Sequence, residues 1–127
     1  MVTPGVARLG EALRVEWQIA GRVAALQKLC LRLEGREEVT YRQGDNTSSA
    51  RSVFADLEIA TQTEPREMGS GSGTLTIPAQ LMHSFAGQHN KVLWVIRVIG
   101  EIPHWPDLNE EFGLTILPAA NKPREDA

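Results

Sequence analysis

Apolar and polar residues alternate with a period of two along much of this chain, which is the pattern of β-strands that are buried on one face. The clearest case is the segment 12–19, whose apolar positions are Leu13, Val15, Trp17 and Ile19. The segment 29–33 repeats the pattern, with leucine at every second position. Such alternation is typical of antiparallel sheets that have one covered and one solvated face.

About eight short strands follow from this pattern, and no segment shows a convincing helical period. The predicted strands are Val6 to Leu9, Ala12 to Ile19, Leu29 to Leu33, Glu38 to Arg42, Arg51 to Thr61, Thr74 to Ile77, Lys91 to Ile99 and Glu111 to Leu117. Gly35 is expected to separate two of them, and the polar run 43–49 is expected to form a hairpin turn. We therefore predict an all-β fold, an immunoglobulin-like antiparallel β-sandwich of about seven to nine strands.

Two internal segments are predicted to lack regular strands. Residues 63–73 contain Pro65 and glycines that alternate with serines, so we expect a mobile loop there. The connection 78–87 is expected to be irregular, with a helical turn over 79–82. Because neither side of the 63–73 loop has enough strands to close a sandwich alone, we predict one domain over residues 1–117, followed by a polar, disordered tail over 118–127.

The segment Lys91 to Ile99 is the strongest predicted strand. One face carries apolar residues from Val92 to Val98, while Leu93, Val95 and Ile99 make the other face apolar as well. We expect this strand to be central in its sheet, and either covered on both faces or using its second face as an interface.

The composition argues against several partners and locations. The 127 residues carry 13 basic and 16 acidic side chains without a basic cluster, so we expect no nucleic acid partner. No segment is apolar enough to span a bilayer, so we expect no membrane insertion. The one cysteine, Cys30, excludes an internal disulfide and favours the cytoplasm or the cytoplasmic side of a membrane protein. Because the first strand begins close to Met1, we expect a soluble domain of a longer protein, with or without a membrane anchor.

Several short motifs follow one another along the chain. Ile77-Pro78 precedes Leu81, His83-Ser84-Phe85-Ala86-Gly87 and the strand with Trp94. Further matches are Pro4-Gly5, Gly10-Glu11-Ala12-Leu13, Leu31-Arg32-Leu33-Glu34-Gly35, and Tyr41-Arg42-Gln43-Gly44 with Thr47 and Phe54. From Pro4 to Leu117 the chain resembles the β-sandwich domains of the arrestin family. The resemblance implies an arrestin-like sandwich in a single-sandwich, bacterial-type member. No buried cluster of arginine and aspartate can be assigned, so phosphopeptide recognition is not carried over.

The chain also contains residue types that serve in catalytic and metal-binding sites. His83, His89 and His104 lie in predicted loops without the close ligand spacing of a zinc site. Ser84 stands beside His83 without a nucleophile elbow, so we expect its hydroxyl to cap a turn. Cys30 is expected to be an inert, half-buried thiol.

The paired acids and the glycine run have ordinary interpretations as well. Glu37-Glu38 and Glu110-Glu111 are expected to be solvated charges at strand ends, which discourage edge pairing. The run 69–73 lacks the lysine and the helix of a phosphate-binding loop. We expect no catalytic residue, no metal and no cofactor.

The predicted loop Ile102 to Leu108 holds Trp105 between two prolines. We favour an indole packed over the end of the sandwich; the alternative is an exposed anchor of the kind enriched at interaction hot spots. Our candidate interaction surface consists of Trp105, His104, Leu93, Val95 and Ile99.

These features predict a non-catalytic module with a protein-interaction or structural role, not an enzyme. Binding would use loops or strand addition at a sheet edge. The expected partner is a protein, which includes a second copy bound through a sheet edge or the Leu93, Val95 and Ile99 face. The alternative is a carbohydrate-binding module in which Trp105 stacks on a sugar. A small hydrolase is the least favoured class, because no triad, metal set or acid pair is present in the sequence.

Overall fold

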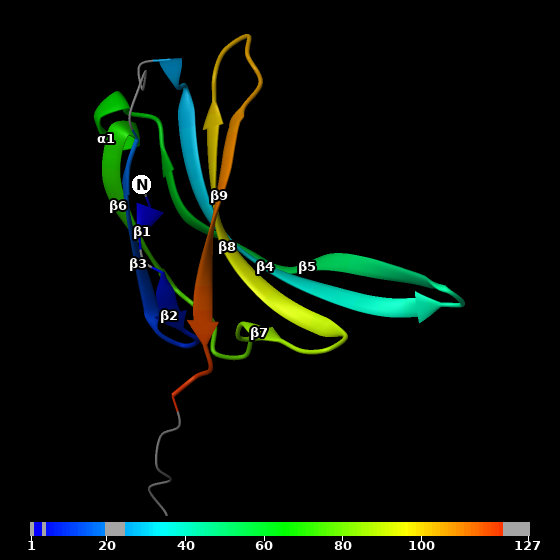
Figure 1. The fold of residues 1–127 in the computed structure, drawn as a ribbon. Coiled ribbons are helices and arrows are strands. Elements are labelled where there is room, and N and C mark those ends of the chain that lie inside the picture. Colours follow the sequence, from blue (N-terminus) through cyan, green and yellow to red (C-terminus); the bar gives the residue numbers. More distant parts are fainter. Residues whose placement is uncertain (1, 4, 20–24, 121–127) are drawn as a thin grey trace, which may run out of the picture.

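The computed structural model describes residues 2–3, 5–19 and 25–120, and they form a sandwich of two β-sheets (Figure 1). The elements in chain order are β1 (Val2–Thr3), β2 (Val6–Arg8), β3 (Ala12–Gln18), β4 (Lys28–Gln43), β5 (Asn46–Gln62), α1 (Pro65–Gly69), β6 (Ser70–Thr76), β7 (Phe85–Ala86), β8 (Asn90–Glu101) and β9 (Leu108–Leu117). The predicted all-β sandwich is confirmed.

The smaller sheet has the strand order β1-β3-β6, and the larger has the order β2-β9-β8-β4-β5, with β7 paired to one end of β8. Almost every strand pair is antiparallel, as predicted. The exception is β2, which runs parallel to β9 and pairs only with its last three residues, from Thr115 to Leu117. The prediction of a purely antiparallel sandwich is wrong at this edge, because the chain crosses from the smaller sheet to the larger one between β1 and β2.

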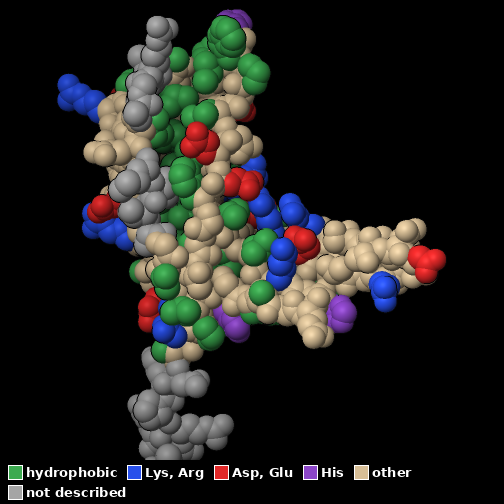
Figure 2. Space-filling view, in the orientation of Figure 1, with side chains coloured by type: hydrophobic (Ala, Val, Ile, Leu, Met, Phe, Trp, Pro, Cys, Tyr) green, Lys and Arg blue, Asp and Glu red, His purple; other side chains and the backbone are tan. Residues whose placement is uncertain are grey.

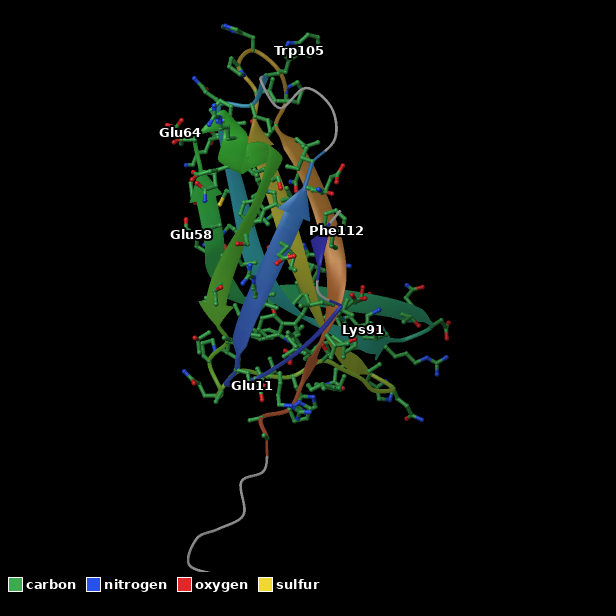
Figure 3. All side chains as sticks on the ribbon, turned by 90° about the vertical axis from the view of Figure 1, so that its left-hand side faces the viewer. Glu11, Glu58, Glu64, Lys91, Trp105 and Phe112 are labelled. Carbon is green, nitrogen blue, oxygen red and sulfur yellow. The ribbon has the colours of Figure 1, made fainter. Side chains whose placement is uncertain are left out.

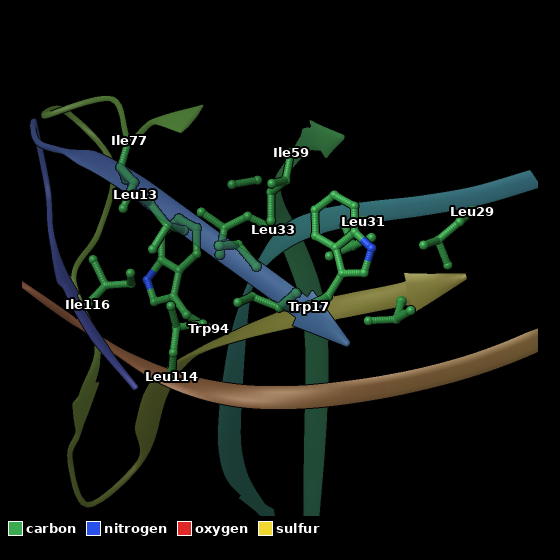
Figure 4. Packing of buried hydrophobic residues seen from close by; sticks show 14 of the residues in the cluster. Leu13, Trp17, Leu29, Leu31, Leu33, Ile59, Ile77, Trp94, Leu114 and Ile116 are labelled. Atoms are coloured by element: carbon green, nitrogen blue, oxygen red, sulfur yellow. The ribbon is translucent and has the colours of Figure 1, made fainter. Parts of the chain in front are cut away.

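The core lies between the two sheets and is built from the alternating residues (Figure 4). Leu13, Val15 and Trp17 of β3 face the leucines of β4, and Trp94 of β8 lies among them. A fully buried side chain of this size stabilises the fold by about 2 kcal/mol relative to an exposed one. The period-two pattern therefore identified most of the residues that hold the sheets together.

Gly35 does not separate two strands, because β4 runs without interruption from Lys28 to Gln43. The glycine faces the core, where the rings of Phe54 and Trp94 pack over it in an edge-to-face pair with centroids 5.3 Å apart. A Cβ atom at this position would lie 2.6 Å from Cζ of Phe54. Gly35 is thus required by close packing and not by a turn, and the predicted break is wrong.

Residues 63–73 form regular structure and not a mobile loop. The short helix α1 buries Met68, and β6 pairs along its whole length with β3. A Cβ atom on Gly71 would lie 2.6 Å from Cζ2 of Trp17, and one on Gly73 would lie 3.0 Å from the carbonyl oxygen of Ile59. The inward glycines let the indole and the neighbouring strand approach, while the serines between them face outward.

The β4–β5 hairpin extends beyond the sandwich as a two-stranded arm (Figure 1). Its turn is at Gly44, which has a φ of +60°, so the hairpin expected over 43–49 is confirmed with a tighter turn. Pairing between β4 and β8 ends at Val39, after which the arm has no third strand among the described residues. Tyr41 on the arm is exposed, and so is Val53, which pairs with Arg36 at the base of the arm.

The connection after β6 also differs in detail from the prediction. Residues 79–82 form a turn but no helix, with the N–H of Leu81 donating to the carbonyl oxygen of Pro78 over 3.4 Å. The short strand β7 follows and pairs with Val92 and Lys91 of β8. At the end of the chain, residues 118–120 have no regular structure, and the rest of the predicted tail lies outside the described residues. No described helix is long and apolar enough to cross a membrane.

Candidate interaction surfaces

Trp105 lies in the β8–β9 loop at one tip of the sandwich, where 73% of its surface is exposed (Figure 3). Hydrophobic side chains gather at this tip in the space-filling view (Figure 2). The favoured interpretation of a packed indole is therefore wrong, and the exposed alternative is the observed one.

The backbone on either side of Trp105 is strongly restricted. The N–H of Trp105 donates to the carbonyl oxygen of Ile102 over 3.2 Å, which closes a β-turn. Pro103 fixes its own φ in this turn, and His104 has a φ of 65°, a conformation that non-glycine residues adopt uncommonly. Pro106 in turn limits Trp105 to extended conformations. The loop therefore presents the indole with little backbone freedom.

The three apolar residues on the outer face of β8 do not form one surface with Trp105. β8 is central, as predicted, between β4 and β9. Its outer face is not covered by another layer, because Leu93 is 39% exposed and Val95 and Ile99 are half-buried. Arg97 lies between Val95 and Ile99, so a charged side chain divides the apolar face that the sequence predicted. Ile99 lies toward the Trp105 loop, and Leu93 toward β7.

A cluster of ion pairs occupies this dividing position on the outer face. Glu34 is 5% exposed and accepts hydrogen bonds from Nε of Arg36 at 2.7 Å and from Nη1 of Arg97 at 3.1 Å. Arg36 also donates to both carboxylate oxygens of Glu111, with Nη1 3.0 Å from Oε2. The cluster joins β4, β8 and β9. It contains no aspartate, so it is not the buried cluster of arginine and aspartate that the sequence left unassigned, and the sequence did not predict it.

The ionisation of the cluster follows from its hydrogen bonds. The bonds from Arg36 hold the pKa of Glu111 below its ordinary value of 4.5. The pKa of Arg36 is raised, first by its hydrogen bonds to Glu111 and then by those to Glu34. The Nε atom of Arg97 is buried without a hydrogen-bond partner. The Arg36 and Glu111 pair is therefore charged at neutral pH, and the cluster links three strands of the larger sheet.

A shallow depression of about 570 Å3 lies on the outer face between β7 and β9. Leu93 and Phe85 line it and are 39% and 38% exposed, and Val95 and Gly113 also line it. A Cβ atom built on Gly113 would meet nothing within 4 Å, so the glycine leaves open space beside Val95. The lining is mostly apolar. Leu93 and Val95 belong to the interaction surface predicted from the sequence, whereas Gly113 does not.

A second hollow, of about 440 Å3, lies on the smaller sheet. Its lining is mixed: Arg14 and Glu16 from β3 and Ser70 and Ser72 from β6 supply polar groups, and Trp17 supplies apolar surface. Arg14 and Glu16 form an exposed ion pair at 3.2 Å. The hollow contains one carboxylate and not a facing pair, so it lacks the arrangement that glycoside hydrolysis requires.

Ser84 and His83 do not form a catalytic pair. The hydroxyl oxygen of Ser84 accepts a hydrogen bond from the backbone N–H of Ile116 over 2.8 Å. The ring nitrogen Nδ1 of His83 lies 2.9 Å from the carbonyl oxygen of Ser84. Ser84 therefore ties the segment before β7 to the distant strand β9, whereas the sequence predicted a local turn cap.

The remaining candidate residues have structural partners. Cys30 is half-buried, and the hydroxyl of Thr61 donates to its sulfur over 3.7 Å. Glu38 forms ion pairs with Arg51 at 3.3 Å and Lys91 at 3.9 Å, so it is not the free strand-end charge that was expected. Within the described ranges, no three His, Cys, Asp or Glu side chains gather as a metal site, so His83, His89 and His104 belong to no such group.

Comparison with known proteins bears on the fold alone. No protein-family model matches the chain, and no curated protein sequence matches it. Among solved structures, Spo0M, a sporulation control protein from Bacillus subtilis, is similar with a TM-score of 0.55 at 12% sequence identity. The alignment covers 92% of this chain and 47% of Spo0M, so the chain spans about half the length of that protein. Spo0M has an arrestin-like fold, so this likeness confirms the predicted arrestin-like fold.

Proposed function

We propose that this arrestin-like sandwich is a non-catalytic protein-interaction module, acting alone or as part of a larger protein. The observation that carries the proposal is Trp105, a largely exposed indole on a conformationally restricted turn. Tryptophan is among the residues most enriched at interaction hot spots. An exposed aromatic ring that is held in place suits contact with another molecule better than it suits the stability of this domain.

The energetics of such a site favour binding. An indole offers on the order of 200 Å2 of surface, of which 73% is exposed at Trp105. Burial of this exposed part by a partner contributes about 4 kcal/mol at roughly 25 cal/mol per Å2. The entropy that a loop loses on binding is smaller when its backbone is already restricted. Pro103 and Pro106 provide that restriction on both sides of Trp105. The loop is therefore pre-organised as an anchor.

The test compares Trp105→Ala with Tyr41→Ala, a control that removes another exposed aromatic ring from the far end of the β4–β5 arm. Immobilised full-length protein captures candidate partners, and the affinity of each purified partner is then measured by calorimetry. We expect Trp105→Ala to weaken the affinity for a partner by about 30-fold or more, which is the range of hot-spot residues. Tyr41→Ala is expected to stay within threefold of wild type. Equal affinity for the wild type and Trp105→Ala would contradict the proposal.

A carbohydrate-binding module is the second candidate, because an exposed indole face can also stack on a sugar ring. A glycan array separates the two functions. Binding of the wild-type protein to one sugar class, lost in Trp105→Ala and kept in Tyr41→Ala, would favour the carbohydrate function. A glycan array without signal, together with a protein partner whose binding depends on Trp105, would exclude the carbohydrate function.

A further inference from the structure

We infer that the free edge of β9 is a strand-addition site for an extended peptide with an apolar and a basic residue two positions apart. The inference rests on the proposed interaction function and adds the place and the chemistry of the partner. The backbone of β9 is covered by β2 at one end only.

Three residues of β9 direct their backbone groups to the uncovered edge. The N–H of Thr115 donates to the carbonyl oxygen of Gly5 over 2.9 Å, so Thr115 faces the side of β2. Alternate residues of a strand face the same side, which places Gly113, Glu111 and Asn109 on that edge as well. β2 reaches only Thr115 to Leu117, and no described strand pairs with the rest of the edge. Unpaired N–H and C=O groups of this kind are the template for an added strand.

The other outer edge of the larger sheet is less suitable for strand addition. β5 forms that edge, and its pairing with β4 has register shifts between Leu31 and Arg32 and between Gly35 and Arg36. Bulges of this kind twist an edge and interrupt its hydrogen-bonding groups, which protects it from pairing. The pairing of β8 with β9 runs from Trp94↔Leu114 to Gly100↔Leu108 without a shift. Of these two edges of the larger sheet, that of β9 is therefore the regular one.

The side chains beside this edge define the residues of the peptide. Opposite Gly113, a peptide side chain on the outer face would meet no side chain from β9 and would enter the apolar depression lined by Val95 and Leu93. Two positions along, the peptide residue would lie opposite Glu111, whose side chain is 43% exposed. Arg36 binds both of its carboxylate oxygens, so a basic peptide residue would be a further partner of a carboxylate that can accept more than two hydrogen bonds. Directly opposite residues of unlike charge stabilise a strand pair. An apolar residue and a lysine or arginine at this spacing therefore match the edge.

The same charges make a second copy of the chain a poor occupant. In an antiparallel pair of β9 edges centred near Glu111, the acidic residues Glu110 and Glu111 of one copy would lie opposite those of the other. Like charges directly opposite each other destabilise strand pairing. The acids thus discourage self-association and leave the edge open to a basic peptide.

The test uses a synthetic nine-residue peptide, Ser-Thr-Thr-Val-Thr-Lys-Thr-Thr-Ser, whose valine lies opposite Gly113 and whose lysine lies opposite Glu111 when the peptide runs antiparallel to β9. It is titrated into the isotopically labelled protein and followed by NMR. We expect shifts at the amides of Asn109, Glu111 and Gly113, and at least tenfold slower hydrogen exchange at these amides at saturation. Two matched peptides serve as controls. Methylation of the peptide N–H groups that face β9 should weaken binding at least tenfold, and replacement of lysine by glutamate should weaken it several-fold.

One protein variant gives an independent readout. Gly113→Pro removes an outward N–H but no bond to β8, so the fold should be kept, as near-UV circular dichroism can check. We expect its affinity for the peptide to fall at least tenfold. If Gly113→Pro does not fold, the methylated peptide on wild-type protein gives the same answer.

Several results would overturn the inference. They are equal binding of the methylated peptide, shifts on β5 in place of β9, and an absence of any shift at millimolar peptide. Shifts at β9 that depend on protein concentration without peptide would identify a second copy as the occupant. The proposed function would stand in each case if a partner still depends on Trp105, so the two failures can be told apart.

Discussion

Glu34 has the most buried charged side chain in the described part of the chain, and its two arginine partners explain how the sheet tolerates it. A buried charge is costly unless it is paired and hydrogen-bonded. Since Arg36 and Arg97 are themselves mostly covered, at 14% and 27% exposure of their side chains, loss of the carboxylate leaves both without their buried acceptor.

We therefore expect Glu34→Ala to lower the free energy of unfolding by about 2 kcal/mol. The matched control is Glu16→Ala, which breaks the exposed ion pair with Arg14 and should cost less than about 0.5 kcal/mol. Urea denaturation of both variants measures the difference. Equal small effects would mean that the cluster contributes no more than surface charges do.

The pair between Arg36 and Glu111 predicts a pH dependence of stability. The folded-state pKa of Glu111 is below its ordinary value of 4.5, so the contribution of this group is present above that value. It is lost as the pH falls through the lower folded-state pKa. Because Glu111 is partly exposed, we expect Glu111→Gln to cost only about 0.5 kcal/mol at pH 7 and less at pH 3. A cost that increases toward acid pH in urea titrations would contradict this sign.

At the scale of the elements, the inward glycines of β6 decide how closely the smaller sheet packs. A Cβ atom on Gly71 would lie 2.6 Å from the indole of Trp17 and 3.0 Å from the carbonyl oxygen of Glu67. We expect Gly71→Ala to destabilise the protein by about 2 kcal/mol, as overpacking commonly does. Gly113→Ala is the control, because open space surrounds that position, and it should be neutral or slightly stabilising. Thermal unfolding measures the stability of both variants. Equal changes in Tm would mean that packing against Trp17 does not matter.

The elements also show what alternation can and cannot predict. The inward residues of β3, β4 and β8 follow from a period of two, and the structure buries most of them. Gly35 and Gly71 were misinterpreted as breaks because glycine marks a turn or a close approach equally well, and only the neighbouring ring distinguishes them. The ion-pair cluster could not be predicted, since it depends on the register that brings Arg97 beside Glu111.

At the scale of the whole molecule, the β4–β5 arm and the tip with the β8–β9 loop differ in the polarity of their side chains. The β4–β5 arm is largely uncharged and polar, while the opposite tip carries Trp105 and other hydrophobic side chains (Figure 2). The sequence predicted the fold and named Trp105, but a tryptophan between prolines is compatible with both a packed and an exposed ring. The free edge of β9 escaped prediction because it depends on where β2 ends.

The central claim, that this domain binds a protein through its β8–β9 hairpin, is tested most directly by the footprint of a captured partner. Hydrogen–deuterium exchange of the full chain, with and without that partner, locates the protected backbone amides. We expect slower exchange in the loop 102–107 and along the β9 edge from Asn109 to Gly113, and no change in the arm from Thr40 to Ser49. Protection that falls on the arm or on the β3–β6 sheet, with the β8–β9 hairpin unchanged, would contradict the account.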